Sequence, residues 1–432
     1  MKSFTFFIGV VLAPTSLLAG ELGASELSTG NTAWILTSTA LVLFMTLPGL
    51  ALFYGGLVGT KNVLSVLMQC FSITAVISVL WLIGLYSMAF SEGTAFVGGL
   101  SKAMLNGVTL DSLSGDIPES VFFMFQMTFA IITPALIVGA FAERMKFNAM
   151  LLFSILWAIF VYAPICHWVW GGGWLQQMGL LDFAGGTVVH VTAGIAALVT
   201  ALVMGKRSGF PNVARPPHNL TMTVTGAGML WVGWFGFNGG SALGANGTAG
   251  MAMLVTHISA SGGVISWSLM EVKKYGKPSV LGAVTGMVAG LGTITPASGF
   301  VGPGGALLIG LIAGVVCFYA TNYIKNVLHI DDSLDVFPVH GVGGIIGTLM
   351  AGIFCSPALG VFSGFGFAQG IDSISSQVYV QAVGVLATGT YTGVATFAIL
   401  KVVALITPLR VSEDEETEGL DISQHEERGY YL

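Results

Sequence analysis

The stretch DFAGGTVVHVTAG, residues 182–194, places Asp182 and then His190 inside a run of small and apolar residues. A related stretch, DVFPVHGVGG, residues 335–344, places His340 in the same setting. Ionisable side chains are rare inside long apolar segments, because burying them is costly, and those that occur there are often functional. The fold and the function of this chain therefore depend on where the two histidines lie.

The composition indicates a membrane protein. Of the 432 residues, 54% are apolar and only 8% are charged, whereas soluble proteins carry about a quarter charged residues. The 60 glycines lie largely within the apolar runs, where small residues let membrane helices approach closely. A membrane β-barrel would show short alternating segments, but these runs are long and continuous. We therefore predict an all-α polytopic membrane protein.

Eleven apolar runs are long enough to cross roughly 30 Å of hydrocarbon. Lysine and arginine favour cytoplasmic loops, and every loop obeys this rule if the N-terminus is outside and the C-terminus inside. Outside the membrane only Lys102 remains, apart from Lys2 near the N-terminus. The predicted spans are 33–58, 63–90, 119–141, 147–168, 183–204, 219–239, 248–270, 279–297, 303–323, 335–355 and 379–406.

The segments before and after the spans differ from them in character. Residues 1–24 have one lysine and a short apolar core interrupted by Pro14, which predicts a signal peptide, the alternative being an uncleaved extra helix. Residues 32–406 form the transmembrane domain. Residues 407–432 form an acidic cytoplasmic tail, and such charge blocks are usually solvated and disordered; a regulatory docking segment is the alternative.

Spans one to five and six to ten form two halves of similar length, followed by a final helix. Since five is odd, the second half enters the membrane from the opposite side, which predicts two inverted five-helix repeats with a substrate path between them. His190 lies roughly 12 Å below the outer start of its span, and His340 roughly 7–8 Å above the inner start of its own. We expect the two imidazoles to meet near the midplane, although each histidine alone is also explained as a polar group bonded to a neighbouring helix.

No acidic residue lies near either histidine in the sequence, so both imidazoles are expected to be uncharged. Neutral imidazoles suit a small polar molecule or a proton better than a bare cation. Two histidines without a third ligand make no metal site, and no cofactor is predicted. The four cysteines have no partner at metal-ligand spacing and are interpreted as packing residues: Cys70, Cys166, Cys317 and Cys355.

Aromatic residues gather on the side predicted to be outer. An anchoring belt at the interface explains Trp174 and Trp168, but it explains less well the alternation of glycine and aromatic residues in span six. Ring faces attract cations by about 0.5–2 kcal/mol each, and a hydroxyl accepts a bond from an N–H donor. The pattern favours a cage for a cation that donates hydrogen bonds, hence ammonium over potassium. The remaining clustered residues are Phe125, Phe129, Trp170, Trp234, Phe237 and Ser241.

From about residue 32 to the C-terminus the chain resembles the ammonium transporter (Amt/Rh) family, in particular its bacterial Amt branch. The DFAGG-containing motif is specific to that family. The matching stretches are ALFYGGLV (51–58), GAFAER (139–144), VWGGGW (169–174), DFAGGTVVHVTAGIAAL (182–198), GWFGFNGGSA (233–242), TPASG (295–299) and DVFPVHGVGGIIG (335–347).

The resemblance implies a homotrimer of eleven-span subunits in the cell inner membrane, each with its own pore. Ammonium is recruited outside and loses a proton, and ammonia then crosses an apolar pore with separate proton transfer. By matching position, the implied roles are an outer substrate site (Phe129, Trp170, Ser241), a gate (Phe129, Phe237, with Trp234 beside the pore), a proton relay (His190, His340) and structural support (Asp182, Thr295).

Several alternatives are weaker. A passive ammonia channel of the Rh branch is disfavoured because that branch lacks the Trp170–Ser241 site, and an ammonium sensor is the other alternative within the family. An enzyme and a nucleic-acid partner are not expected. The tail resembles the family segment that helps dock a PII-type nitrogen signalling protein. It departs from that segment at Glu426 and Gly429, where glycine and alanine are expected.

Overall fold

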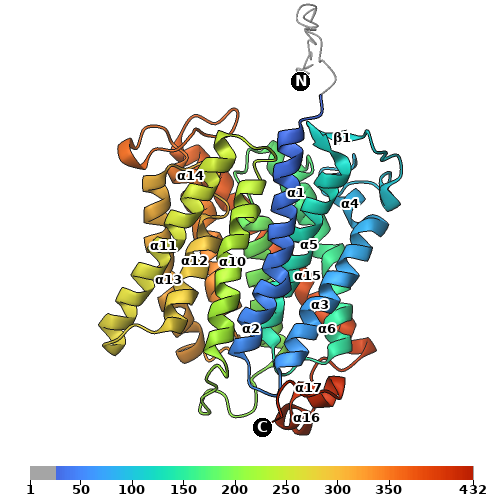
Figure 1. Ribbon diagram of the computed structural model, residues 1–432, viewed down its shortest axis with the longest axis vertical. Coiled ribbons are helices and arrows are strands. Elements are labelled where there is room, and N and C mark those ends of the chain that lie inside the picture. The colour runs from blue at the N-terminus through green and yellow to red at the C-terminus, as the bar shows by residue number, and fades with distance from the viewer. Residues whose placement is uncertain (1–25, 432) are drawn as a thin grey trace, which may run out of the picture.

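The computed structural model describes residues 26–431, so the predicted signal peptide lies outside the described residues. Within that range the molecule is a bundle of long helices standing side by side, with one short hairpin at the end where α1 begins (Figure 1).

The α-helices of the first part are α1 (Thr29–Phe44), α2 (Ala51–Leu57), α3 (Val63–Leu80), α4 (Tyr86–Phe90), α5 (Glu119–Phe141), α6 (Phe147–Trp157), α7 (Ala163–Trp170), α8 (Trp174–Gln177) and α9 (Thr192–Met204). Those of the second part are α10 (Leu220–Gly240), α11 (Gly247–Tyr275), α12 (Val280–Ile294), α13 (Pro303–Asn326), α14 (Val342–Phe354), α15 (Ile374–Ile406), α16 (Glu413–Glu418) and α17 (Leu420–His425). Five π-helical segments adjoin them: η1 (Met45–Leu50), η2 (Trp81–Leu85), η4 (Ala158–Tyr162), η5 (Gly186–Val191) and η6 (Phe337–Gly341). The 3-10 turns are η3 (Ala103–Leu105) and η7 (Gly360–Phe362), and the hairpin pairs β1 (Leu113–Ser114) with β2 (Ile117–Pro118).

Ten helical segments within residues 26–431 are long and apolar enough to cross a membrane. They coincide with ten of the eleven predicted spans, which confirms a multi-pass helical membrane protein. The remaining predicted span, 279–297, contains α12, whose 15 residues rise roughly 22 Å at 1.5 Å each. The chain continues beyond Ile294 as buried turns. Irregular backbone of this kind is tolerated at membrane depth where protein covers it.

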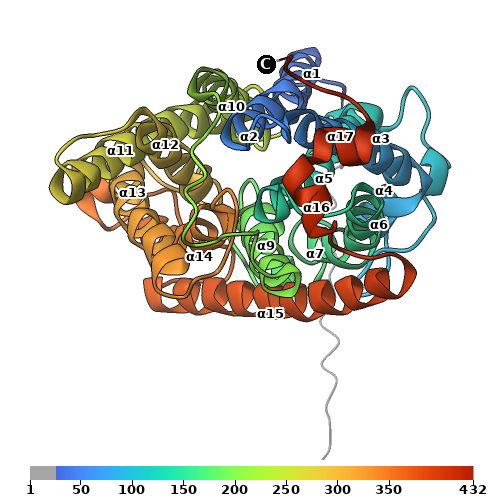
Figure 2. The same ribbon diagram turned by 90° about the horizontal axis from the view of Figure 1, so that it is seen from below.

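The helices differ strongly in how deeply they are buried. In α5, 89% of the apolar window is buried inside the molecule, against 28% in α15. Figure 2 shows α15 running along one whole side of the bundle. The start of α1 and the tail lie at opposite ends of the bundle (Figure 1). Because α5 lies at the centre, its side chains are placed to line an internal passage.

The two histidine-bearing segments cross at glycines. An added Cβ at Gly194 would lie 2.2 Å from the Cα atom of Gly341, and one at Gly344 would lie 2.9 Å from the Cβ atom of His190. Small residues at a crossing let helix backbones approach closely. The glycines of α9, η6 and α14 therefore make it possible for His190 and His340 to come together.

The acidic tail is folded, so the prediction of a solvated, disordered segment is wrong. Helices α16 and α17 pack on the end of the bundle opposite the start of α1 (Figures 1 and 2), and Glu416, Leu420 and Asp421 are buried. The Asp421 carboxylate accepts a hydrogen bond from Ser65 N–H at 2.8 Å, and Leu420 N–H donates to the Asn62 side chain at 2.8 Å. The charge density suggested solvation, but both carboxylate oxygens of Glu416 and one of Asp421 have specific partners.

The two departures of the tail from the family pattern fit the backbone differently. Glu426 ends α17 with φ of 57°, a left-handed conformation that favours glycine. Gly429 lies where a Cβ would touch Leu64 at 3.4 Å, an ordinary contact distance. Glutamate at 426 therefore strains the backbone slightly, while alanine would fit at 429.

Candidate substrate pathway

A cavity of about 170 Å³ lies on the side where α1 begins. Three predicted residues, Phe129, Trp170 and Ser241, line it together. The indole N–H of Trp170 donates to the main-chain oxygen of Asp182 at 2.9 Å. The Ser241 hydroxyl donates to the Phe237 carbonyl at 2.8 Å, which leaves its lone pairs free to accept a bond. The other lining residues are Phe90, Phe122, Gln126, Gln176, Phe183 and Leu243.

Two phenyl rings close the bottom of this cavity, which we call the outer cavity after the side predicted from the sequence. The centroids of Phe129 and Phe237 are 4.3 Å apart, and both side chains are buried. Trp170 meets Phe129 edge to face at 5.7 Å. Trp170 and Ser241 lie above this constriction, Phe237 forms part of it, and Trp234 lies below it beside the histidines.

The two histidines lie directly below the constriction. Nδ1 of His190 and Nδ1 of His340 are 3.1 Å apart, and the planes of the two rings are within 10° of parallel. Trp234 also stacks on His190, with centroids 5.6 Å apart. Both imidazoles line a narrow cavity of about 10 Å³, close to the smallest space that holds one water. Its other walls are mostly apolar and include Leu50, Phe53, Ile132, Leu136, Val189, Leu230 and Val288.

A third cavity, of about 130 Å³, continues from His340 toward the end that carries the tail. Its polar side chains include Arg215, Lys325 and Asp335, and Lys325 pairs with Asp335 at 2.8 Å. The middle cavity shares Phe53 and His340 with this inner one, and the Phe129–Phe237 pair separates it from the outer one.

An aspartate begins each histidine segment: Asp182 in the first, and Asp332 in the second. The Asp182 carboxylate accepts hydrogen bonds from the N–H groups of Gly185 and Thr187, both at 2.8 Å. It therefore supports the start of η5, as expected of a structural residue. In the second segment Asp332, rather than Asp335, accepts from Phe337 N–H at 2.7 Å. Burial, reinforced by Asp335, raises the pKa of Asp332 to about 6.

The second predicted support residue, Thr295, is buried beside Trp234. Its hydroxyl accepts the indole N–H of Trp234 at 2.9 Å and donates to the Leu291 carbonyl at 2.8 Å. Thr295 thus holds the ring that stacks on His190. It lies below the outer cavity instead of at its mouth.

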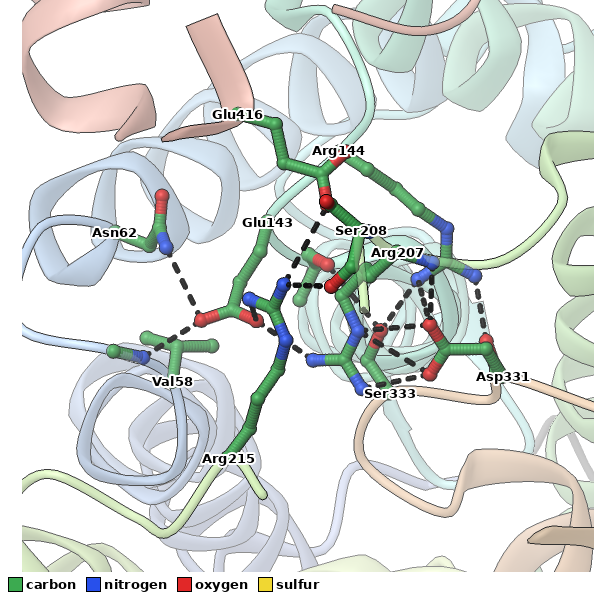
Figure 3. A network of polar contacts seen from close by, with 12 residues as sticks. Val58, Asn62, Glu143, Arg144, Arg207, Ser208, Arg215, Asp331, Ser333 and Glu416 are labelled. Atoms are coloured by element: carbon green, nitrogen blue, oxygen red, sulfur yellow. Dashed lines mark hydrogen bonds and ion pairs between the residues drawn. The ribbon is translucent and has the colours of Figure 1, made fainter. Parts of the chain in front are cut away.

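Sequence reasoning missed two features of this pathway. Both histidines lie in π-helical segments, η5 and η6, which occur frequently at functional sites. The second feature is a network of buried ion pairs at the inner end, shown in Figure 3. Arg207 pairs with Glu143 at 2.7 Å and with Asp331 at 2.7 Å. The clustering of acids and arginines in GAFAER and HIDDS was the available signal.

The tail joins this network through one carboxylate. Glu416 pairs with Arg410 at 2.6 Å and with Arg215 at 3.7 Å, and it accepts the N–H of Ser208 at 2.8 Å. Arg215 in turn pairs with Glu143 at 3.4 Å (Figure 3). Since Arg215 lines the inner cavity, the tail contacts a residue of the pathway.

Attraction to arginine outweighs burial in the acids of the network. Burial alone raises the pKa of Glu143, but Arg207, the N–H of Gly59 and Arg215 lower it below its ordinary value of 4.5. The same balance between burial and Arg207 lowers the pKa of Asp331. Both acids are therefore ionised at neutral pH and neutralise the buried arginines.

The fold and the cavities define a multi-pass helical membrane protein with a narrow, largely apolar passage for a small solute. A profile of the Ammonium Transporter Family matches residues 33–430. The chain is also 47% identical to an ammonium transporter of Bacillus subtilis (strain 168) over 93% of this chain and 98% of that protein. The chain belongs to the ammonium transporter family.

Solved structures of the same family have the same fold. A structure described as a sensor Amt protein gives a TM-score of 0.85 at 29% identity, covering 92% of this chain and 98% of that one. Mep2 of Saccharomyces cerevisiae gives 0.81 at 36% identity, covering 90% of this chain and 91% of that one. The similarity spans the whole membrane domain.

Proposed function

We propose that this protein moves ammonium across the membrane by removing one proton from it and conducting the resulting ammonia. The observation that carries the proposal is the unbroken sequence of side chains Trp170, Phe129, Phe237, His190 and His340, with ring-to-ring distances of 5.7, 4.3, 6.2 and 5.2 Å. Aromatic faces hold a cation above the phenyl pair, and imidazoles hold a neutral polar molecule or a proton below it.

Ammonium binds in the outer cavity and breaks one N–H bond there. The bonding electron pair stays on nitrogen, and the proton passes to water in that cavity, because the Asp182 carboxylate is occupied by backbone N–H groups. Ammonia then passes the phenyl rings into the apolar middle cavity. A bare cation is rejected at this point, since an apolar wall offers no replacement for its hydration shell.

Below the phenyl rings, the histidine pair can pass a proton from one imidazole to the other. At 3.1 Å between Nδ1 atoms, one imidazole donates and the other accepts, so the tautomers of the two rings differ. Two positive charges at this distance repel strongly, so the pair carries at most one extra proton. His190 Nε2 has no partner within the described residues, and this leaves it available to ammonia or to water.

The test is charge movement in proteoliposomes on adding ammonium, comparing wild type with His190→Ala and His340→Ala. We expect ammonium current to fall and selectivity against potassium to weaken in both variants. His257→Ala is the matched control, because His257 lies exposed on α11 and away from the three cavities. Wild-type transport and selectivity in both pathway variants would rule out the proton relay.

A sensor is the second candidate, favoured by the similarity to the sensor Amt structure. The same proteoliposomes separate the two functions. A sensor binds ammonium without carrying current. Binding in the outer cavity should change the fluorescence of Trp170, which lines that cavity. A current that saturates with ammonium and depends on the histidines supports the transporter.

For the membrane arrangement we propose eleven spans, with α12 as the eighth, as two inverted five-helix repeats and a final helix. The N-terminus lies outside and the tail in the cytoplasm of a cell inner membrane. The distribution of lysine and arginine supports this orientation. Thiol labelling of Gly30→Cys and Ser412→Cys, two exposed positions at opposite ends of the bundle, from one side of intact cells tests it.

For partners we propose a homotrimer and a PII-type signalling protein on the face that carries the tail. The apolar faces of many helices are exposed on a single subunit, which supports lateral packing in the membrane. Native mass spectrometry should give a complex of three identical chains. Deleting residues 412–432 should abolish PII binding, and unchanged binding would exclude the tail from that interface.

A further inference from the structure

Gln126 is a buried polar side chain in the outer cavity that no role described so far uses. It lies on α5, three residues before Phe129, and is 8% exposed. Its Oε1 atom has no hydrogen-bond partner within the described part of the chain. An unpaired buried acceptor is costly, so one that lines a cavity is satisfied when a donor enters that cavity.

The other polar side chains of the cavity leave few acceptors free. The Gln176 Oε1 atom already accepts the N–H of Gly172 at 2.7 Å. The Trp170 indole is only a donor, and its N–H is already bonded. The Ser241 hydroxyl donates its hydrogen bond to the Phe237 carbonyl, so its own lone pairs remain free to accept. Among the lining side chains with an acceptor oxygen, Ser241 and Gln126 are therefore the two whose oxygen accepts no hydrogen bond within residues 26–431.

The nearest carboxylate on the same helix face is not available. Glu119 lies seven residues before Gln126, two turns away on the same face of α5. Its Oε1 atom accepts the Tyr86 hydroxyl at 2.7 Å and is bonded to Lys102. The cation in the cavity therefore meets ring faces and neutral oxygens instead of a free negative charge.

We propose that Gln126 is a substrate-binding residue that accepts an N–H bond from ammonium in the outer cavity, beside Ser241. The proposal rests on the proposed function. An amide turns about its last torsion at little cost, so its oxygen can face the cavity. A neutral amide replaces part of the hydration lost by the cation and does not trap it as a carboxylate would, which keeps the ion free to lose a proton.

The experiment measures ammonium and methylammonium currents in proteoliposomes as a function of concentration. Gln126→Leu should raise the half-saturating ammonium concentration about tenfold or more, as expected for a lost bond to a charged donor. Methylammonium has one N–H donor fewer, so its half-saturating concentration should rise less in this variant. The ratio of the half-saturating concentrations of methylammonium and ammonium should therefore become smaller.

Gln69→Leu is the matched control. Gln69 is also buried with an unpartnered Oε1 among residues 26–431, but it lies on α3 and does not line the outer cavity. Its substitution should leave the half-saturating concentration unchanged. An equal shift in Gln69→Leu and Gln126→Leu would overturn the proposal.

A second variant guards against misfolding of the first. Gln126→Glu places a negative charge in the same volume and should lower the half-saturating concentration, slow the maximal current and increase block by potassium. Unchanged potassium block in this variant overturns the proposal as well. If wild type carries no current, the proposed function fails; if Ser241→Ala shifts half-saturation while both Gln126 variants do not, only the role of Gln126 fails.

Discussion

His190 and Gln126 share a property that distinguishes them from most buried polar residues of this protein. Each has an atom without a partner among residues 26–431, whereas Asp182 and Trp234 have their polar atoms bonded to backbone or to Thr295. An unmet buried polar atom costs about 1–3 kcal/mol. A polar solute that forms a hydrogen bond with such an atom removes this free-energy cost. Unpaired atoms of the passage are therefore the places where a hydrogen bond to substrate contributes most to binding.

Glu143 shows the opposite case, a buried acid with a full set of partners. Its pKa is lower in the folded than in the unfolded protein. The stabilisation it provides is therefore complete above 4.5 and declines as the pH falls through the folded-state pKa.

We predict that Glu143→Gln unfolds more easily than wild type at pH 7, by about 1.5–3 kcal/mol for lost bonds to a charged partner. The difference should shrink as the pH falls below 4.5, because the unfolded chain then binds a proton at Glu143 while the folded protein keeps this acid ionised. Thermal unfolding in detergent at pH 7 and at pH 4 measures it. A difference that stays constant with pH would show that the charge of Glu143 does not stabilise the fold.

Helix crossings, rather than single side chains, set the distance between the two histidines. Segments η5 and η6 each widen the helix by one residue at the histidine, and glycines remove the side chains that would keep the segments apart. An added Cβ at Gly194 would overlap Gly341 at 2.2 Å. The space between the rings is therefore a property of both helices together.

We predict that Gly194→Ala separates these helices, costs about 1–3 kcal/mol in stability and lowers ammonium current at least tenfold, since the hydrogen bond between the histidines is lost. Gly389→Ala on α15 is the control, because a Cβ there would meet nothing closer than 3.9 Å. The test compares the ammonium current and the thermal stability of the two variants. Equal behaviour of the two variants would mean that the crossing is not tightly packed.

At the scale of the whole molecule, the inner face is tied together by the tail. Glu416 bonds to the loop at Ser208, to Arg410 before α16 and, at 3.7 Å, to Arg215. Segments that are distant in the sequence therefore share one buried carboxylate. The backbone before α16 is also held, since Val411 N–H donates to the Arg144 carbonyl at 3.0 Å.

We predict that Glu416→Gln loosens the tail and makes the bond after Arg410 more sensitive to trypsin, by about tenfold for 1.4 kcal/mol of lost docking energy. Glu413→Gln in the same helix is the matched control, because Glu413 is exposed. Cleavage rates of the two variants in detergent give the comparison. Equal rates would show that the tail is held by its apolar contacts alone.

Much of the architecture could be predicted from the order of residues. Hydropathy along the chain identified the membrane class and the spans, because burial in lipid depends on the composition of each segment by itself. Spacing and a family resemblance selected the residues that line the three cavities. The ends of the spans were predicted less accurately: the predicted span 147–168 continues through α8 to Gln177.

What only the tertiary structure decided are relations between distant segments. It assigned Asp332 to the start of η6, bonded Trp234 to Thr295, joined Arg207 to two acids and docked the tail that its charge had suggested was disordered. The sequence by itself determined which segments enter the membrane, because that depends on local hydrophobicity. The partners of buried polar side chains depend on which loops lie next to each other. That arrangement follows from the packing of the complete bundle.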